Sequence, residues 1–138
     1  MNDPYLDDPF VAAQPENRPF WDAAEQGRLL GKRCDDCGRH HWYPRVVCPF
    51  CGSANTAWVA LSGRGRIHAF STLRRADPPY TVAYVELAEG PKMLTNLVDM
   101  AEADMRIGAP VTVVFRRTPE GRMAPKFVLE ATAVPDPV

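Results

Sequence analysis

The stretch CDDCGRHHWYPRVVCPFC, residues 34–51, contains all four cysteines of the 138-residue chain. Its two pairs, Cys34 with Cys37 and Cys48 with Cys51, each have the spacing Cys-x-x-Cys, and ten residues separate the pairs. Two such knuckles bring four thiolates to one point, and zinc accepts four thiolates in a tetrahedron. The spacing therefore predicts a structural metal site with these four cysteines as its ligands.

Other uses of four cysteines fit this stretch less well. Disulfides are rare in the reducing compartment that the rest of the sequence indicates, and a thioredoxin-like redox pair requires one motif in a βαβ context. Rubredoxin-type iron uses a similar spacing, so iron stays open beside zinc. Because four thiolates fill the tetrahedron, His40 and His41 are predicted to be strand or turn residues, and the site is expected to stabilise the fold without catalysing a reaction.

The composition is that of an ordinary globular domain, 46% hydrophobic and 24% charged, with a formal net charge of -1. No apolar run approaches the roughly 20 residues of a membrane helix. The acidic start, MNDPYLDDPF, has neither the basic region nor the apolar core of a secretory signal. We therefore expect a cytoplasmic protein that does not enter a membrane.

The charges are unevenly distributed along the chain. Between Arg28 and Arg75 there are nine Lys or Arg residues and only two acidic residues, Asp35 and Asp36. A basic middle in a chain of balanced charge fits an anionic partner or ligand, and it fits an ordinary solvated surface equally well.

The chain divides into five predicted segments. We expect a flexible N-terminal arm, a helix, the zinc ribbon, a β-barrel and a C-terminal tail, at residues 1–16, 17–30, 31–58, 59–133 and 134–138, respectively.

The predicted helix has recognisable end signals. Asn17 is its expected cap and Gly31 its expected stop. A helix this short is not stable alone, so it must pack on something. Its aromatic residues Phe20 and Trp21 are predicted either to pack in the core or to dock a partner.

Five stretches after residue 60 have the character of strands, and turn residues separate them. They are GRIHAFSTL, YTVAYVEL, KMLTNLVD, APVTVVFRR and APKFVLEATAV, with one longer insertion, DMAEADMRIG. Five strands in a segment of this length match an OB-type barrel. The predicted fold class is therefore mainly β: an N-terminal helix, a zinc ribbon and a five-stranded OB-fold barrel.

Several motifs, taken in order, resemble one family. They are PFWDAAEQGRLLGKRC (19–34), CGRHHWYPR (37–45), CPFCGS (48–53), SGRGRIHAFS (62–71), YTVAYVELAEGPKMLTNLV (80–98) and MRIGAPVTVVF (105–115). Over about residues 17–132 the chain is similar to the DUF35 family, OB-fold proteins that carry a rubredoxin-like zinc ribbon and an N-terminal helix. The four cysteine positions show no departure from the family's pattern.

The resemblance implies an accessory role. Members are commonly encoded beside thiolase-like enzymes of the lipid-transfer-protein class, or beside hot-dog-fold enoyl-CoA hydratases, and they form hetero-oligomers that carry out acyl-CoA chemistry. We therefore expect a non-catalytic, zinc-binding subunit of an acyl-CoA thiolase or aldolase complex, with a hot-dog hydratase as the alternative partner. Nucleic-acid binding, which zinc ribbons and OB folds perform elsewhere, is the less favoured hypothesis.

Two arginines are candidates for contact with CoA or another anion. Arg64 and Arg66 lie in the basic middle of the chain, at the entry to the first predicted barrel strand. Solvated turn arginines are the plainer interpretation of the same residues.

Overall fold

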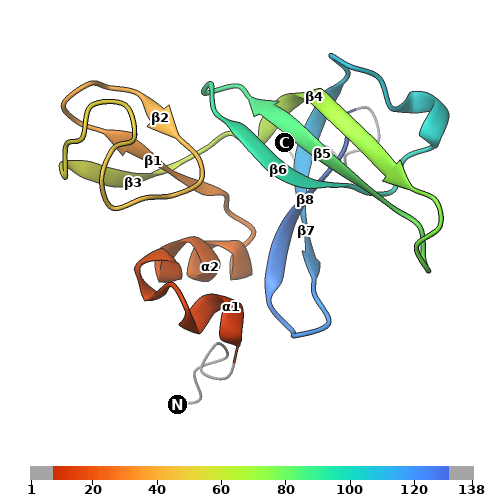
Figure 1. Cartoon of the computed structure of the whole chain (residues 1–138), viewed down its shortest axis with the longest axis horizontal. Helices are drawn as coiled ribbons and strands as arrows, with labels where there is room; N and C mark the ends of the chain where they lie inside the picture. The colour runs from red at the N-terminus through yellow and green to blue at the C-terminus, as the bar shows by residue number, and fades with distance from the viewer. Residues whose placement is uncertain (1–7, 131–138) are drawn as a thin grey trace, which may run out of the picture. The chain divides into compact units, whose positions relative to one another are not determined.

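The computed structural model describes residues 8–130, so the predicted C-terminal tail at 134–138 lies outside the described residues. The described chain divides into two units (Figure 1). The ribbon unit takes the residues up to Leu61 together with Phe115–Pro125, and the barrel unit takes Ser62–Val114 and the residues from Lys126 on. None of the helices in residues 8–130 has the length and apolar character needed to cross a bilayer.

The ribbon unit begins with three short helical elements, α1 (Pro9–Ala12), η1 (Pro15–Asn17) and α2 (Arg18–Glu25). The predicted flexible arm is therefore corrected for residues 8–16, while residues 1–7 lie outside the described residues. The Asp8 side chain accepts a hydrogen bond from the Phe10 amide and caps α1. Val11 on this helix is buried, so the segment is held by packing as well as by its cap.

Helix α2 confirms the predicted N-terminal helix, although both of its ends differ from the prediction. The Asn17 side chain does not cap the helix, because its amide donates to Gln14 Oε1 and to the Tyr43 hydroxyl. The helix ends at Glu25, well before Gly31. Gly27 takes a φ of 73°, and the amides of Gly27 and Arg28 close a Schellman motif on the carbonyls of Ala24 and Ala23.

A small antiparallel sheet follows, with strand order β2-β1-β3. Its strands are β1 (Leu30–Cys34), β2 (His40–His41) and β3 (Thr56–Ala60). Strand β1 pairs with both neighbours, and Arg33 lies opposite His40 on one side and Ala57 on the other. His40 and His41 are thus strand residues, as the sequence predicts.

The five predicted strands are present, and η2 (Glu102–Asp104) lies in the predicted long insertion. The strands are β4 (Arg64–Leu73), β5 (Tyr80–Leu87), β6 (Lys92–Leu97), β7 (Pro110–Arg117) and β8 (Met123–Leu129). They close into a barrel of order β4-β5-β6-β8-β7, in which β6 and β8 run parallel and the other described pairs are antiparallel. This topology confirms the predicted OB-type fold.

Alternation of side chains builds the barrel core. On β5, Thr81, Ala83, Val85 and Leu87 are buried, while Tyr80, Tyr84 and Glu86 are exposed, as the two-residue period of a strand requires. The largest fully buried side chains of this unit are Ile67, Val85, Leu87, Val111 and Phe127.

The tip of the β7–β8 hairpin belongs to the ribbon unit, and two ion pairs hold it to the helices. Arg117 pairs with Glu25 at 3.0 Å in an exposed position. Arg122 pairs with Asp8 at 2.9 Å, and only 12% and 4% of these two side chains are exposed. The Arg122 guanidinium also lies over the rings of Phe10 and Trp21, at 4.6 and 5.4 Å from their centroids.

Removal of the buried arginine should therefore destabilise the ribbon unit. The substitution Arg122→Met keeps the apolar stem but leaves the Asp8 carboxylate buried without its partner. We expect it to lower the free energy of unfolding by about 2 kcal/mol. The matched control Arg117→Met should cost only about 0.5 kcal/mol, because solvent screens its pair. Chemical denaturation measures both, and equal losses would contradict the role given to Arg122.

The same ion pair should make stability depend on pH. Burial raises the pKa of Asp8, but hydrogen bonds from Arg122 and the Phe10 amide and the charge of Arg122 outweigh it and hold that pKa below its ordinary value of 3.8. When folding lowers the pKa of a carboxyl group, the charged group stabilises the fold at any pH above the pKa that it has in the unfolded chain. This contribution is lost as the pH falls through the lower pKa of the folded state. The stability difference between wild type and Asp8→Asn should therefore be full at about pH 6 and shrink below about pH 4. Denaturation over this range measures it, and a difference that does not change with pH would contradict this assignment.

Candidate metal centre

The four cysteines lie on two turns that the small sheet holds together. Cys34 is the last residue of β1, and Cys37 follows in the turn toward β2. Cys48 and Cys51 lie in the second turn, between β2 and β3. In each pair the first cysteine is buried and the second is exposed.

The four sulfur atoms converge. All four lie within 4.8 Å of one another, with Cys34 Sγ 3.5 Å from Cys51 Sγ and Cys37 Sγ 3.8 Å from Cys48 Sγ. In a regular tetrahedron with Zn–S bonds of about 2.3 Å, the sulfurs are about 3.8 Å apart. These residues therefore fit a metal ion with tetrahedral coordination by four sulfur atoms. All four cysteines that the sequence predicts as ligands lie together at this centre.

The two turns repeat one hydrogen-bond pattern. The Cys34 amide donates to the Arg39 carbonyl, and the Cys48 amide donates to the Ser53 carbonyl at the matching position. Gly38 and Gly52 occupy equivalent places with φ of 76° and 80°, which glycine adopts without a Cβ penalty. The turns are thus two copies of the same knuckle.

Backbone amides also point at the sulfurs. The Cys37 amide donates to Cys34 Sγ at 3.5 Å, and the Phe50 amide donates to Cys48 Sγ at 3.4 Å. The amide of Cys37 is the main cause that lowers the pKa of Cys34 to about 7, against the opposing effect of burial. Amides directed in this way favour thiolates, the form of cysteine that binds metals.

The opposite shift at Cys51 shows that the sulfurs crowd one another. The Ser53 amide lowers the pKa of Cys51, but the nearby sulfur of Cys34, partial desolvation and the sulfurs of Cys48 and Cys37 together outweigh it and raise that pKa to about 12. Four thiolates this close repel one another unless a cation lies among them. The chemistry of the donor set therefore fits a divalent metal ion.

The other predicted site residues do not join this centre. Phe20 is 4% exposed and packs against Trp21 and Trp42, with ring centroids 4.9 and 5.0 Å apart. It is a core residue of the ribbon unit, and Trp21 is half-buried. Docking of a partner through this pair stays a prediction, although the burial of Phe20 leaves little of its ring accessible.

Arg64 and Arg66 lie on β4 and are both exposed. The Arg66 guanidinium donates to the Gly108 carbonyl at 3.3 Å. A contact of either arginine with CoA remains a prediction.

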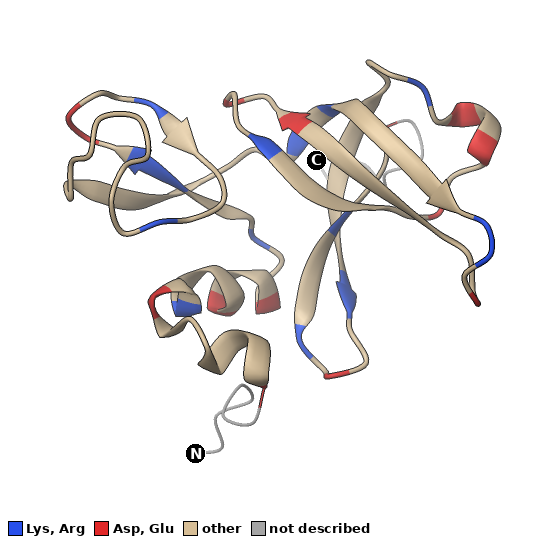
Figure 2. Ribbon diagram, viewed as in Figure 1, with Lys and Arg blue, Asp and Glu red and all other residues tan. Residues whose placement is uncertain are grey.

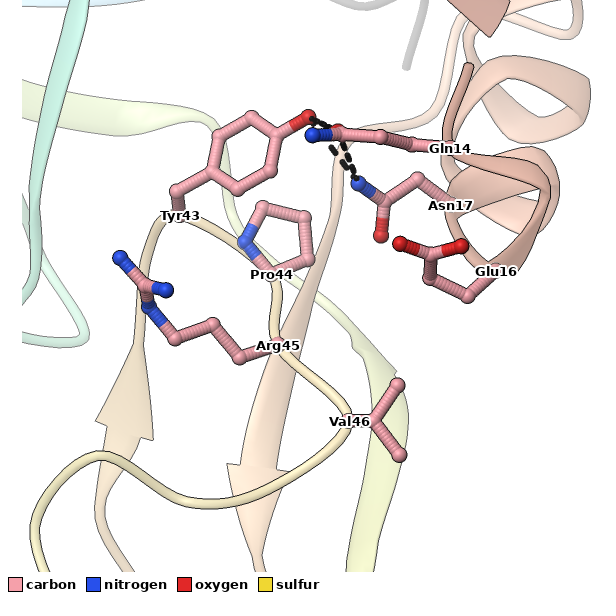
Figure 3. A pocket seen from close by; sticks show the side chains of 7 residues that line it. All are labelled: Gln14, Glu16, Asn17, Tyr43, Pro44, Arg45 and Val46. Atoms are coloured by element: carbon pink, nitrogen blue, oxygen red, sulfur yellow. Dashed lines mark hydrogen bonds between the residues drawn. The ribbon is translucent and has the colours of Figure 1, made fainter. Parts of the chain in front are cut away.

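A polar pocket in the ribbon unit was not predicted from the sequence. It has a volume of about 350 Å³ and is lined by Gln14, Glu16, Asn17, Tyr43, Pro44, Arg45 and Val46 (Figure 3). Tyr43, Gln14 and Asn17 are joined by hydrogen bonds along one side of it. These residues are up to 29 positions apart, so nothing in the local sequence could have revealed the pocket.

Two family models match consecutive parts of the chain. The rubredoxin-like zinc ribbon domain of ChsH2 matches residues 21–57, and the C-terminal OB-fold domain of ChsH2 matches residues 58–116. A DUF35 domain-containing scaffold protein from Methanocaldococcus jannaschii is 34% identical over 99 residues, which are 67% of this chain and 70% of that protein. The chain belongs to the DUF35 family.

Other proteins similar to this chain are described as parts of enzymes. A chain of a solved Ltp2-ChsH2(DUF35) aldolase superposes with a TM-score of 0.71 at 34% identity, covering 82% of this chain and 93% of that chain. A probable enoyl-CoA hydratase alpha subunit from Thermomonospora curvata is 34% identical over 76% of this chain, and this chain spans only 34% of its length. The benzoylsuccinyl-CoA thiolase subunit BbsA of Geobacter metallireducens is 33% identical over 50% of this chain and 49% of its own.

Substitution of a buried cysteine tests the ligand assignment. Cys34→Ser or Cys48→Ser should reduce the bound metal from about one ion per chain to almost none, because one of the four ligands is lost. The ribbon should then unfold, since metal binding supplies its folding free energy. Metal analysis of the purified protein and the near-ultraviolet circular dichroism of its tryptophans measure the two effects.

The control for this experiment is His40→Ala, which removes the half-buried histidine beside the first knuckle. It should leave the metal content unchanged. Loss of metal in the His40 variant together with retention in both cysteine variants would show that the ligand set is different.

Proposed function

We propose that this DUF35 protein is a non-catalytic accessory subunit of a heteromeric acyl-CoA-processing enzyme, a thiolase or aldolase of the thiolase-like, lipid-transfer-protein class. The observation that carries this proposal is the likeness to the DUF35 chain of an aldolase complex, at 34% identity over nearly all of that chain. The match includes both the ribbon and the barrel, since it covers 82% of this chain.

The metal in this proposal is zinc with a structural role. Four cysteine sulfurs complete a tetrahedron, so an ion there has no position left for water or substrate. When bound, the ion supplies positive charge that stabilises four thiolates and ties the two knuckles together. The residues that would hold it are Cys34, Cys37, Cys48 and Cys51. Iron accepts the same ligands, and visible absorbance of the purified protein distinguishes the two metals, because the zinc form is colourless.

The thiolase or aldolase assignment has support from two relatives. BbsA is a subunit of a benzoylsuccinyl-CoA thiolase, and the solved chain belongs to an aldolase; thiolases and aldolases both form or break carbon–carbon bonds. The hydratase subunit gives a specific reason to keep a second candidate, an accessory subunit of a hot-dog enoyl-CoA hydratase.

Co-expression with a thiolase-like enzyme of the lipid-transfer-protein class from the same genome tests the proposal. We expect the two chains to elute together in size-exclusion chromatography, and the enzyme to lose most of its turnover of an acyl-CoA substrate when this chain is left out. This chain alone should show no turnover of the same substrate.

Two results would contradict the proposal. One is separate elution of the two proteins with equal activity of the enzyme in the absence of this chain. The other is substantial turnover of a thioester by this chain alone. Co-elution with a hot-dog protein from the same genome in place of the thiolase-like enzyme would favour the hydratase alternative.

A further inference from the structure

We propose that residues 43–50, the loop that leads from β2 into the second knuckle, are the surface on which the thiolase-like enzyme subunit docks, and that this loop contacts an apolar patch bordered by carboxylates. This proposal rests on the proposed function, because it names the surface through which the accessory subunit would act. It is argued from the exposure, charge, rigidity and shape of this loop.

The loop exposes large apolar side chains in close succession. Tyr43, Val46, Val47 and Phe50 are 45%, 58%, 46% and 49% exposed, within eight residues of chain. Single exposed apolar residues are ordinary on protein surfaces, but a cluster of them marks a site of interaction. Burial of such a cluster in a complex would remove apolar surface from water, which is the main driving force of association.

The charge of this region indicates what kind of surface it contacts. Residues 38–52 include Arg39 and Arg45 and contain no aspartate or glutamate, as the colouring of the ribbon in Figure 2 also shows. The Arg39 guanidinium lies 3.7 Å from the centroid of the Phe50 ring. A positive charge and a large exposed apolar side chain are therefore in direct contact on this surface. Aromatic residues and arginine are the residue types enriched in the centres of interfaces. Charge complementarity then requires acidic groups on the partner.

The backbone of the loop is fixed on both sides and in its middle. Strand β2 precedes the loop, and the last residues of the loop, 48–50, belong to the second knuckle. The His41 Nε2 atom accepts a hydrogen bond from the Arg45 amide, and the Val46 carbonyl accepts one from the Thr56 hydroxyl at 3.0 Å. Burial lowers the pKa of His41, which keeps its imidazole neutral and able to accept this bond. A fixed loop loses little entropy on binding.

The pocket described above lies beside this loop and shares Tyr43, Pro44, Arg45 and Val46 with it (Figure 3). Figure 3 shows the Tyr43 hydroxyl directed toward Gln14 and Asn17, where it closes one side of the pocket. The Asn17 side chain is almost completely buried and holds Tyr43 through a 3.0 Å hydrogen bond. In many interfaces one side chain of the partner fills a preformed pocket, and apolar residues around the pocket exclude water. The loop and the pocket have this arrangement.

The outer face of the barrel also exposes apolar residues and supplies the control. Tyr84 and Leu94 face each other across β5 and β6 and are 46% and 58% exposed. The next pair on the same face of the sheet is Glu86 and Lys92, whose charged groups lie 3.7 Å apart. This face thus presents both signs of charge, whereas residues 38–52 include arginines and no aspartate or glutamate.

The experiment measures binding of the full-length, metal-loaded chain to the thiolase-like enzyme with which it is co-expressed. Val46→Asp and Phe50→Asp should each weaken binding by at least about 30-fold, the effect of losing a central anchor and adding charge that repels an acidic partner. Arg45→Glu should slow association and reduce its dependence on ionic strength. The matched control Leu94→Asp, an equally exposed residue on the barrel, should bind as wild type does. Unchanged metal content in every variant shows that the ribbon remains folded.

The outcomes separate this proposal from the proposed function. If wild type binds the enzyme and the loop variants bind it equally well, the loop is not the docking surface, while the accessory role stands. Loss of binding in Leu94→Asp alone would place the interface on the barrel and overturn the proposal. If wild type does not bind the enzyme at all, both proposals fail.

Discussion

Four sulfur atoms held within 4.8 Å of one another set the structure of the ribbon unit. Its sheet has three strands, one of them only two residues long, and so offers little apolar surface to bury. The two knuckles repeat the same hydrogen bonds and direct amides at sulfur, but amides alone cannot offset repulsion among four thiolates. A bound cation removes that repulsion and links the two turns, and the loop between them becomes a rigid part of the surface.

The rest of the ribbon unit is assembled from residues far apart in the chain. The aromatic rings of Phe20, Trp42 and Tyr43 follow one another in contact, and the Tyr43 hydroxyl reaches the residues before α2. The Arg122 guanidinium connects the tip of the β7–β8 hairpin to the start of α1 through its buried ion pair with Asp8. The loop proposed to dock the enzyme is thus supported by the metal centre at its C-terminal end and by the helices at Tyr43. These supports connect stability of the fold with the proposed function.

The sequence was sufficient for features that depend on local pattern. The five barrel strands follow from two-residue alternation and turn residues, and the Cys-x-x-Cys spacing identified the four sulfurs that converge. Features that depend on distant partners were missed. Residues 8–16 were predicted as a flexible arm because nothing near them in the chain shows that Arg122 would bury Asp8. Asn17 is a residue type that caps helices, yet its side-chain amide donates to the Tyr43 hydroxyl. Gly27, whose φ is positive, ends α2 four residues before the predicted stop at Gly31.

We propose that a zinc ion coordinated by four cysteine sulfurs, with no open coordination position, stabilises this ribbon as a structural part of a larger enzyme. X-ray absorption spectroscopy of the freshly purified full-length chain tests it most directly. The account predicts a zinc edge and a first shell of four sulfur scatterers at about 2.3 Å, unchanged when an acyl-CoA is added. A first shell with nitrogen or oxygen scatterers, or one that changes on addition of the acyl-CoA, would mean an open or different site and would contradict the account.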